Sequence, residues 1–253
     1  MKQTIIAVIN QKGGVGKTTT ATNVAAQLAS ENTPVLIVDL DPQGNATSGL
    51  GIERETEPTT YDVLFSRATL EQTVRTTGRP GLYILPANAN LAAAEIELVP
   101  QMQREYALKN ALKTAAYHYI LIDCPPALGL LTINALSAAD AILIPVQSEY
   151  YALEGLGQLL ATVQRVKEAL NPGLDLLGVA LTMYDKRTSL SEQVFTELKN
   201  HFGDKLFKTV VPRNVRLAEA PSFGKTIQEH DRWSKGARAY KSLAKEVANR
   251  VNG

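Results

Sequence analysis

The chain has 253 residues, of which 45% are hydrophobic, with 26 Lys and Arg against 25 Asp and Glu. This size and composition are typical of a folded protein with a sizeable core and exclude an extended disordered chain. Its single cysteine, Cys124, excludes an internal disulfide and a four-cysteine zinc or iron–sulfur site within one chain. No segment has the apolar length of a signal peptide or membrane span, so we expect a cytoplasmic protein.

The nearly neutral total hides a difference in charge between two parts of the chain. Residues 204–253 contain 11 Lys and Arg against 5 Asp and Glu, whereas residues 1–203 contain 15 against 20. This excess of positive charge predicts an anionic partner for the C-terminal part.

Short apolar runs alternate along the chain with longer segments of helical periodicity. The apolar runs predict buried strands at residues 4–10, 34–40, 82–87, 119–125, 141–147, 176–184 and 208–212. The periodic segments predict helices at residues 18–30, 104–115, 156–170, 190–201 and 236–251. Residues 44–81, charged and threonine-rich, predict loops and short helices. The alternation predicts one α/β domain over residues 1–253, with a mostly parallel sheet and helices on both faces.

A glycine cluster follows the first predicted strand, in the stretch NQKGGVGKTTT at residues 10–20. Glycines let successive N–H groups converge on an anion, and the following helix adds its positive dipole end. The stretch therefore predicts a phosphate-binding loop, in which Lys17 contacts the β and γ phosphates and Thr18 contacts Mg²⁺. The alternative is a turn that only joins strand to helix. The predicted nucleotide-binding residues of the loop are Lys12, Gly13, Gly14, Val15, Gly16, Lys17, Thr18 and Thr19.

The loop departs from the usual pattern G-x-x-x-x-G-K-[ST], because Gln11 replaces the first glycine and Lys12 follows it. The form K-G-G-x-G-K-[ST] resembles the ParA/MinD group of P-loop ATPases, and in particular the Soj type of partitioning ATPase. The resemblance implies that two subunits enclose ATP and that Lys12 contacts the nucleotide of the partner subunit. Otherwise Lys12 is a solvated loop lysine.

Two further stretches place acidic residues at strand ends. VDLDPQGNATSGLG, residues 38–51, resembles the first switch region of Soj-type proteins, which implies that Asp41 orients the attacking water and that Asp39 lies near Mg²⁺. Asp41 can also cap the turn before Pro42. YILIDCPPALGLLTINAL, residues 119–136, is an apolar strand ending in Asp123, the arrangement of an acid that holds Mg²⁺ through water. Cys124 is interpreted as a packed thiol.

Later stretches extend the resemblance. VVPRNVRLAEAPSFGK, residues 210–225, matches the Soj pattern in which the loop containing Pro212 and Asn214 lines the adenine pocket. IPVQSEYYALEGL, residues 144–156, is also similar and implies that Glu149 contacts ribose across the dimer.

The resemblance implies an ATP-dependent homodimer that binds double-stranded DNA without sequence preference, which makes the protein nucleoid-associated. Arg187, Arg216 and Lys225 are the candidate DNA contacts, and each can equally be a solvated surface charge. A ParB-like centromere-binding protein is implied as the partner that stimulates ATP hydrolysis. Two other classes remain, a small-molecule synthetase and a MinD-like membrane-associated ATPase. The small apolar residues of the basic tail, 234–253, suit a helix packed on the sheet, so we expect no stable membrane association.

Overall fold

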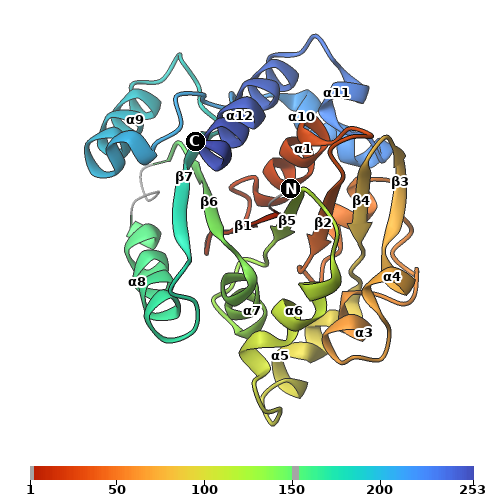
Figure 1. Ribbon diagram of the computed structural model, residues 1–253. Helices are drawn as coiled ribbons and strands as arrows, with labels where there is room; N and C mark the ends of the chain where they lie inside the picture. Colours follow the sequence, from red (N-terminus) through yellow and green to blue (C-terminus); the bar gives the residue numbers. More distant parts are fainter. Residues whose placement is uncertain (1–2, 150–153) are drawn as a thin grey trace.

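A seven-stranded sheet forms the centre of the computed structural model, which describes residues 3–149 and 154–253 (Figure 1). The strand order is β3-β4-β2-β5-β1-β6-β7, and all neighbours run parallel except β3 and β4. The mostly parallel sheet predicted from the sequence is thus confirmed. The strands are β1 (Thr4–Val8), β2 (Val35–Asp39), β3 (Arg75–Arg79), β4 (Leu82–Leu85), β5 (Tyr119–Asp123), β6 (Ala141–Gln147) and β7 (Asp175–Thr182).

Helices cover both faces of the sheet, which explains why the central strands are apolar without polar alternation. In β1, Ile6 and Val8 belong to the core on one face, and Ala7 belongs to the core on the other. The first face is covered by α1 (Lys17–Leu28), α2 (Asn45–Gly49), α11 (Ile227–His230) and α12 (Lys235–Asn252). The second is covered by α3 (Thr60–Leu64), α4 (Leu70–Thr73), α6 (Ala107–Ala111), α7 (Leu130–Ala138), α8 (Glu154–Ala169) and α9 (Ser189–Phe202).

Short helical segments connect these layers. They are α5 (Ala94–Glu97), α10 (Val215–Glu219) and the 3-10 turns η1 (Ala89–Ala93), η2 (Arg104–Tyr106), η3 (Leu112–Thr114), η5 (Gly203–Lys205) and η6 (Ala220–Phe223). Figure 1 shows α1 and α12 together on one side of the sheet, with α6 and α7 on the other. Within the described ranges, no helix is both long and apolar enough to cross a bilayer.

Two predicted elements are wrong in form. Residues 208–212 are not a strand, and this part of the chain makes only isolated bridges, at Leu206 and Pro212. The carboxylate of Glu246 accepts hydrogen bonds from the backbone N–H groups of Lys208 and Thr209, which are therefore not free for a ladder. The helix predicted over residues 104–115 is instead three short turns, η2, α6 and η3.

The elements that the sequence failed to predict include strand β3 and helix α7. Strand β3 lies within residues 44–81, and its sequence RTTGR has no apolar residue because it forms the partly exposed edge of the sheet. Helix α7 carries apolar and small residues on all sides, since most of its side chains are buried, and so it lacks the periodicity of a surface helix.

Candidate nucleotide-binding site

The predicted phosphate-binding loop leads directly from β1 into α1. Gly14 and Gly16 adopt positive φ angles of 74° and 86°, which favour glycine. Helix α1 begins at Lys17, and no side chain caps its first turn, which also contains no acidic residue. The first N–H groups of a helix lack intrahelical partners and favour an anion. The loop and the helix N-terminus together can therefore bind phosphate groups.

Two polar side chains fix this loop to neighbouring strands. The Asn10 amide donates to the carbonyl of Pro145 at 2.7 Å, and its oxygen accepts from the backbone N–H of Lys12 at 3.0 Å. The Thr182 hydroxyl donates to the carbonyl of Val15 at 2.8 Å. Sequence reasoning missed both. Asn10 could have been found as a polar residue that ends an apolar run, whereas Thr182 has no local signal because it comes from β7.

The two loop lysines lie in different environments. Lys17 is buried, and its ammonium donates to the carbonyl of Lys12 at 3.1 Å. Burial lowers the pKa of Lys17, and the negative charge of Asp123 opposes this shift. The ammonium of Lys12 instead forms an ion pair with Glu149 of the same chain at 2.6 Å, close to the surface. Of the Soj-like stretch around Glu149, residues 150–153 lie outside the described residues.

Asp39 and Asp123 are neighbours in register on β2 and β5, and both are fully buried. One carboxylate oxygen of Asp39 accepts hydrogen bonds from the Thr47 backbone at 2.8 Å and from its hydroxyl at 2.7 Å. The other accepts from the N–H of Asp41 at 3.2 Å. Neither oxygen of Asp123 has a hydrogen-bond partner in the part of the chain that the structure describes.

The acids differ in how their surroundings affect protonation. Burial raises the pKa of Asp39 to about 6, although the hydrogen bonds from Thr47 oppose the shift. Burial, followed by the charge of Asp39, raises the pKa of Asp123 well above its usual range. The hydroxyl of Thr18, outside hydrogen-bond geometry with these oxygens, offsets only part of that rise. The charge of Lys17 opposes the rise only in part, so a bound cation would further favour the ionised form of Asp123.

A magnesium ion together with phosphate oxygens fits this arrangement. Mg²⁺ in phosphate-transfer sites is commonly bound through one or two carboxylates, substrate phosphates and water. Among the described residues, no three His, Cys, Asp or Glu side chains are grouped to hold a metal by themselves. Asp123 and Thr18 can hold the ion as predicted. The carboxylate of Asp39 is already bonded to Thr47, so we assign it an indirect part.

Asp41 is nearly buried beside this pair of acids. One of its carboxylate oxygens accepts from the N–H of Gln43 at 2.9 Å, and its carbonyl accepts from the N–H of Gly44 at 2.9 Å. The turn-capping alternative is thus confirmed. It leaves room for the predicted contact with water, because only one oxygen accepts the capping bond. Sequence reasoning missed Thr47, which links Asp39 to the N–H of Ala87 at 2.9 Å.

A cavity of about 320 Å³ adjoins the phosphate-binding loop. Its lining includes Gly16 and Thr19 from the loop side, Pro212 and Asn214 from the predicted adenine-binding segment, and Tyr240 from α12. The structure therefore brings both predicted segments to one cavity. Its volume and its partly apolar lining suit a purine base.

The predicted DNA contacts lie on separate segments of the chain and differ in pairing. Arg187 forms an ion pair with Asp185 at 2.7 Å, in the loop before α9. Arg216, on α10, lies 2.9 Å from a carboxylate oxygen of Glu219. Lys225, between η6 and α11, is exposed and has no ion-pair partner within residues 3–149 and 154–253. The two arginines are thus partly neutralised by the protein itself.

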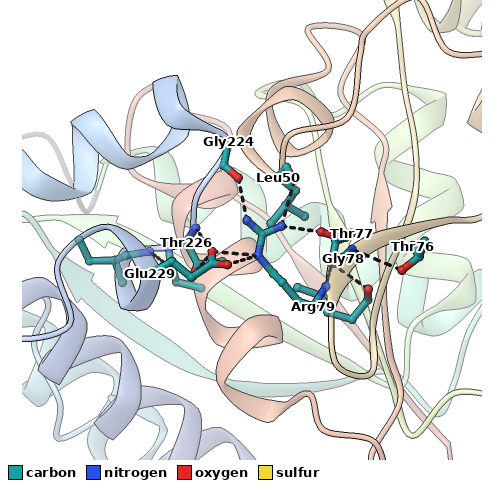
Figure 2. A network of polar contacts seen from close by, with 11 residues as sticks. Leu50, Thr76, Thr77, Gly78, Arg79, Gly224, Thr226 and Glu229 are labelled. Carbon is teal, nitrogen blue, oxygen red and sulfur yellow. Dashed lines mark hydrogen bonds and ion pairs between the residues drawn. The ribbon is translucent and has the colours of Figure 1, made fainter.

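The guanidinium of Arg79, in β3, connects the end of α2 with η6 and α11 (Figure 2). It donates to both carboxylate oxygens of Glu229, at 3.0 and 2.8 Å, and to the carbonyl of Gly224 at 2.7 Å. It also donates to the carbonyl of Leu50 at 2.9 Å, at the end of α2. Because Asp39 holds α2 through Thr47, these bonds join the nucleotide side of the molecule to α11.

The loop, the helix N-terminus and the buried acids define a P-loop nucleotide-binding protein with a modified phosphate loop. A family model described as an AAA domain matches residues 3–176. The chain is 58% identical to the sporulation initiation inhibitor protein Soj of Bacillus subtilis over 247 residues, covering 96% of this chain and 98% of that protein. It is 51% identical to the chromosome partitioning protein ParA of Caulobacter vibrioides over 251 residues, covering 97% and 94%. The chain belongs to the ParA/Soj family of chromosome-partitioning ATPases.

One solved structure with the same fold belongs to a protein that is named as a synthase and not as a partitioning protein. Cobyrinic acid a,c-diamide synthase from Mycobacterium smegmatis, solved with bound ADP and magnesium, superimposes with a TM-score of 0.87. The identity is 36%, and the match covers 100% of this chain and 96% of that one. The fold is therefore shared with a protein that binds a nucleotide and magnesium.

Proposed function

We propose that ATP joins two copies of this ATPase into a dimer, that the dimer binds duplex DNA nonspecifically on the nucleoid, and that a ParB-like partner stimulates hydrolysis and releases it. The observation that carries the proposal is the buried carboxylate of Asp123, which no described residue pairs, beside Lys17. Such a site is complete only with a cation, and magnesium with ATP supplies it. The nucleotide and magnesium in the related synthase support this choice.

Each residue of the site then has one task. Lys17 and the N–H groups at the start of α1 bind the β and γ phosphates, and Thr18 and Asp123 hold the magnesium ion. The ion neutralises charge on the phosphates, which is the main requirement of phosphoryl transfer. Asp41 orients the attacking water, while Asp39 holds the backbone of Asp41 in place through a 3.2 Å hydrogen bond. The adenine occupies the cavity beside Pro212 and Asn214.

Dimer formation assigns a role to the second lysine. Lys12 is near the surface and is held by Glu149. In the dimer, Lys12 leaves Glu149 and contacts the triphosphate of the other subunit, whose charge is greater than that of one carboxylate. The extra positive charge stabilises a polyanion enclosed between two subunits.

Gel filtration with ATP tests the dimer. A Cβ atom added at Gly13 would meet none of the described residues of its own chain within 4 Å, apart from its sequence neighbours, so Gly13→Val is compatible with the monomer. We expect this variant to bind ATP and remain monomeric, because the valine clashes with the partner subunit. Asp41→Ala is the matched variant and should form a long-lived ATP dimer. A normal Gly13→Val dimer would contradict the enclosed nucleotide.

Cosedimentation distinguishes DNA from membrane as the target. On α12, the apolar side chains of Tyr240, Leu243 and Val247 are buried in the core and are not available to a bilayer. We expect ATP to increase sedimentation with random-sequence DNA and not with anionic liposomes. ATP-dependent binding to liposomes alone would overturn the DNA assignment, and ATPase activity that responds only to a small molecule would favour a synthetase.

A further inference from the structure

An exposed tryptophan stands at the start of α12. Trp233 is the only tryptophan of the chain, and 77% of it is accessible to solvent. The Arg232 guanidinium carbon lies 4.9 Å from the centre of the indole ring. Tryptophan and arginine are enriched at binding surfaces, because the indole offers a large apolar face together with a polar N–H group.

Trp233 is adjacent to Arg216, one of the predicted DNA contacts. Asp231 accepts a hydrogen bond from the backbone N–H of Trp233 at 3.2 Å, and its carboxylate lies 3.7 Å from Nε of Arg216. Helices α10 and α12 also touch directly. A Cβ atom at Gly236 would come within 2.8 Å of the Leu217 side chain. The exposed residues Arg216 and Trp233 are therefore carried by segments that lie side by side.

Helix α12 continues this surface with a row of cations. Lys235, Arg238, Lys241 and Lys245 are exposed and recur along the side of the helix that faces away from the core. Over the described ranges of the chain, none of the four forms an ion pair. By contrast, Arg216 is paired with Glu219 at 2.9 Å. Positive charge that the protein does not neutralise is therefore concentrated on α12.

We propose that Arg232, Trp233 and the cation row of α12 (Lys235, Arg238, Lys241 and Lys245) form a contact surface for duplex DNA that is continuous with Arg216. This inference rests on the DNA-binding function proposed above and names further residues for it. From Lys235 to Lys245 the helix rises about 15 Å, a length along which duplex DNA carries about nine phosphate charges. The row contacts phosphates, and the indole packs against the exposed sugar and base edges of a groove.

A bilayer does not fit the same surface. A helix that lies in a membrane interface needs a continuous apolar face, and that of α12 is buried in the core. The exposed large apolar side chains of this C-terminal region are Val215, Phe223 and Trp233, which lie on different segments and do not form the face of one helix. Duplex DNA needs no apolar face, because binding is driven by the release of counterions from neutralised phosphates.

Because the chain has one tryptophan, its fluorescence reports on this surface without any mutation. We would record emission and acrylamide quenching of the wild-type protein with a nonhydrolysable ATP analogue, while adding random-sequence duplex DNA or phosphatidylglycerol vesicles. Anisotropy of a dye-labelled duplex measures DNA binding independently. We expect DNA to reduce quenching at least about twofold, in parallel with anisotropy, since contact shields the indole.

The outcomes separate this inference from the proposed function. If anisotropy shows DNA binding while Trp233 stays fully accessible to acrylamide, the surface is wrong and the function stands. If anisotropy shows no binding of the ATP dimer to DNA, the proposed function fails and the surface fails with it. Protection by vesicles and not by DNA would overturn the surface in favour of a membrane.

Charge reversal supplies a second test with a matched control. Lys113 in η3 is exposed like Lys241 but lies on the opposite face of the sheet. We expect Lys241→Glu to weaken DNA binding about tenfold at low salt and to reduce the salt slope by about 1, while Lys113→Glu changes neither. Trp233→Ala should weaken binding about fivefold or more. All three variants should form the ATP dimer. Equal DNA affinities for Lys241→Glu and Lys113→Glu would refute the proposal.

Discussion

The two ends of the parallel sheet both carry charged residues, but only one end leaves a buried charge without a partner. At the amino end, Asp175 pairs with Lys205 at 3.0 Å, and the Arg250 guanidinium donates to the carbonyl of Leu206 at 2.9 Å. At the carboxyl end, Asp123 has no partner among the described residues. The amino end nevertheless has the larger cavity, about 640 Å³ against about 320 Å³.

This difference shows which feature indicates a ligand. Paired charges at the amino end stabilise the protein as it is, and a cavity between them needs no occupant. The carboxyl end keeps Asp123 and Lys17 buried at a cost in free energy that only a bound group of suitable charge can offset. Unsatisfied buried charge is therefore a better guide to the site than cavity volume.

Removing one lysine at each end of the sheet should give the largest difference, which is in the affinity for ATP. We expect Lys17→Ala to weaken ATP binding at least about 100-fold, because several charge-assisted hydrogen bonds to phosphates are lost. Lys205→Ala removes a surface ion pair and a hydrogen bond to the carbonyl of Leu176, and should leave the affinity within about twofold, with about 1 kcal/mol lost from the free energy of unfolding. Isothermal titration calorimetry and urea unfolding measure the two effects. Similar losses of affinity in both variants would contradict the comparison.

Neutralising one aspartate at each end gives a smaller contrast. Asp123→Asn should weaken the apparent affinity for magnesium, measured by ATP hydrolysis, about 10- to 100-fold. In the absence of nucleotide it should not lower the free energy of unfolding, since it removes a buried charge that no described residue pairs. Asp175→Asn should do the reverse, with unchanged hydrolysis and a loss of stability below about 1 kcal/mol. A strongly destabilised Asp123→Asn variant would show that this carboxylate has a structural partner.

The pH dependence of stability distinguishes the two ends by sign. The folded-state pKa of Asp39, about 6, is above its value in the unfolded chain, so the folded state binds the proton more tightly. This group therefore stabilises the nucleotide-free protein by about 1 kcal/mol as the pH falls from 7 to 5. At the amino end the pKa of Asp175 is lowered, so its contribution is kept in this range and is lost only in stronger acid.

Urea unfolding of the wild type and of Asp39→Asn, at three values of pH between 7 and 5, measures the pH-dependent contribution of Asp39 to the free energy of unfolding. The slopes are compared and not the absolute stabilities, because the substitution also changes the hydrogen bonds to Thr47. Parallel profiles would show that Asp39 does not take up a proton in this range.

The sequence predicted the features of the site that depend on local pattern. Strands β1, β2 and β5 are continuous apolar runs, and the glycines and Lys17 of the phosphate-binding loop are contiguous in sequence, so the carboxyl end of the sheet could be located. The edge strand β3 could not, because its residues are polar and it is held by pairing with β4.

The other features of the site depend on contacts between residues that are far apart in the sequence. The position of Asp39 near magnesium stays a prediction, but its hydrogen bonds to Thr47 could not be predicted, because they depend on how α2 folds back onto β2. Arg187 stays a predicted DNA contact, although the structure pairs it with Asp185. The sequence located an excess of cations in residues 204–253 but could not show that four of them lie on one side of α12. Composition shows how many charges a segment has, but only the fold shows which of them are already paired.

The smallest expected effect concerns Cys124, next to Asp123 at the carboxyl end of β5. The thiol is 1% exposed, belongs to the core and donates to the carbonyl of Ile122 at 3.8 Å. Burial raises the pKa of Cys124 well above its usual range, so the reactive thiolate is scarce at neutral pH. We expect Cys124→Ala to change ATP hydrolysis less than about twofold, at a cost of about 1 kcal/mol in stability. Iodoacetamide at pH 8 should modify the thiol in urea and not in the native protein; rapid native modification would place it in the nucleotide site with Asp123.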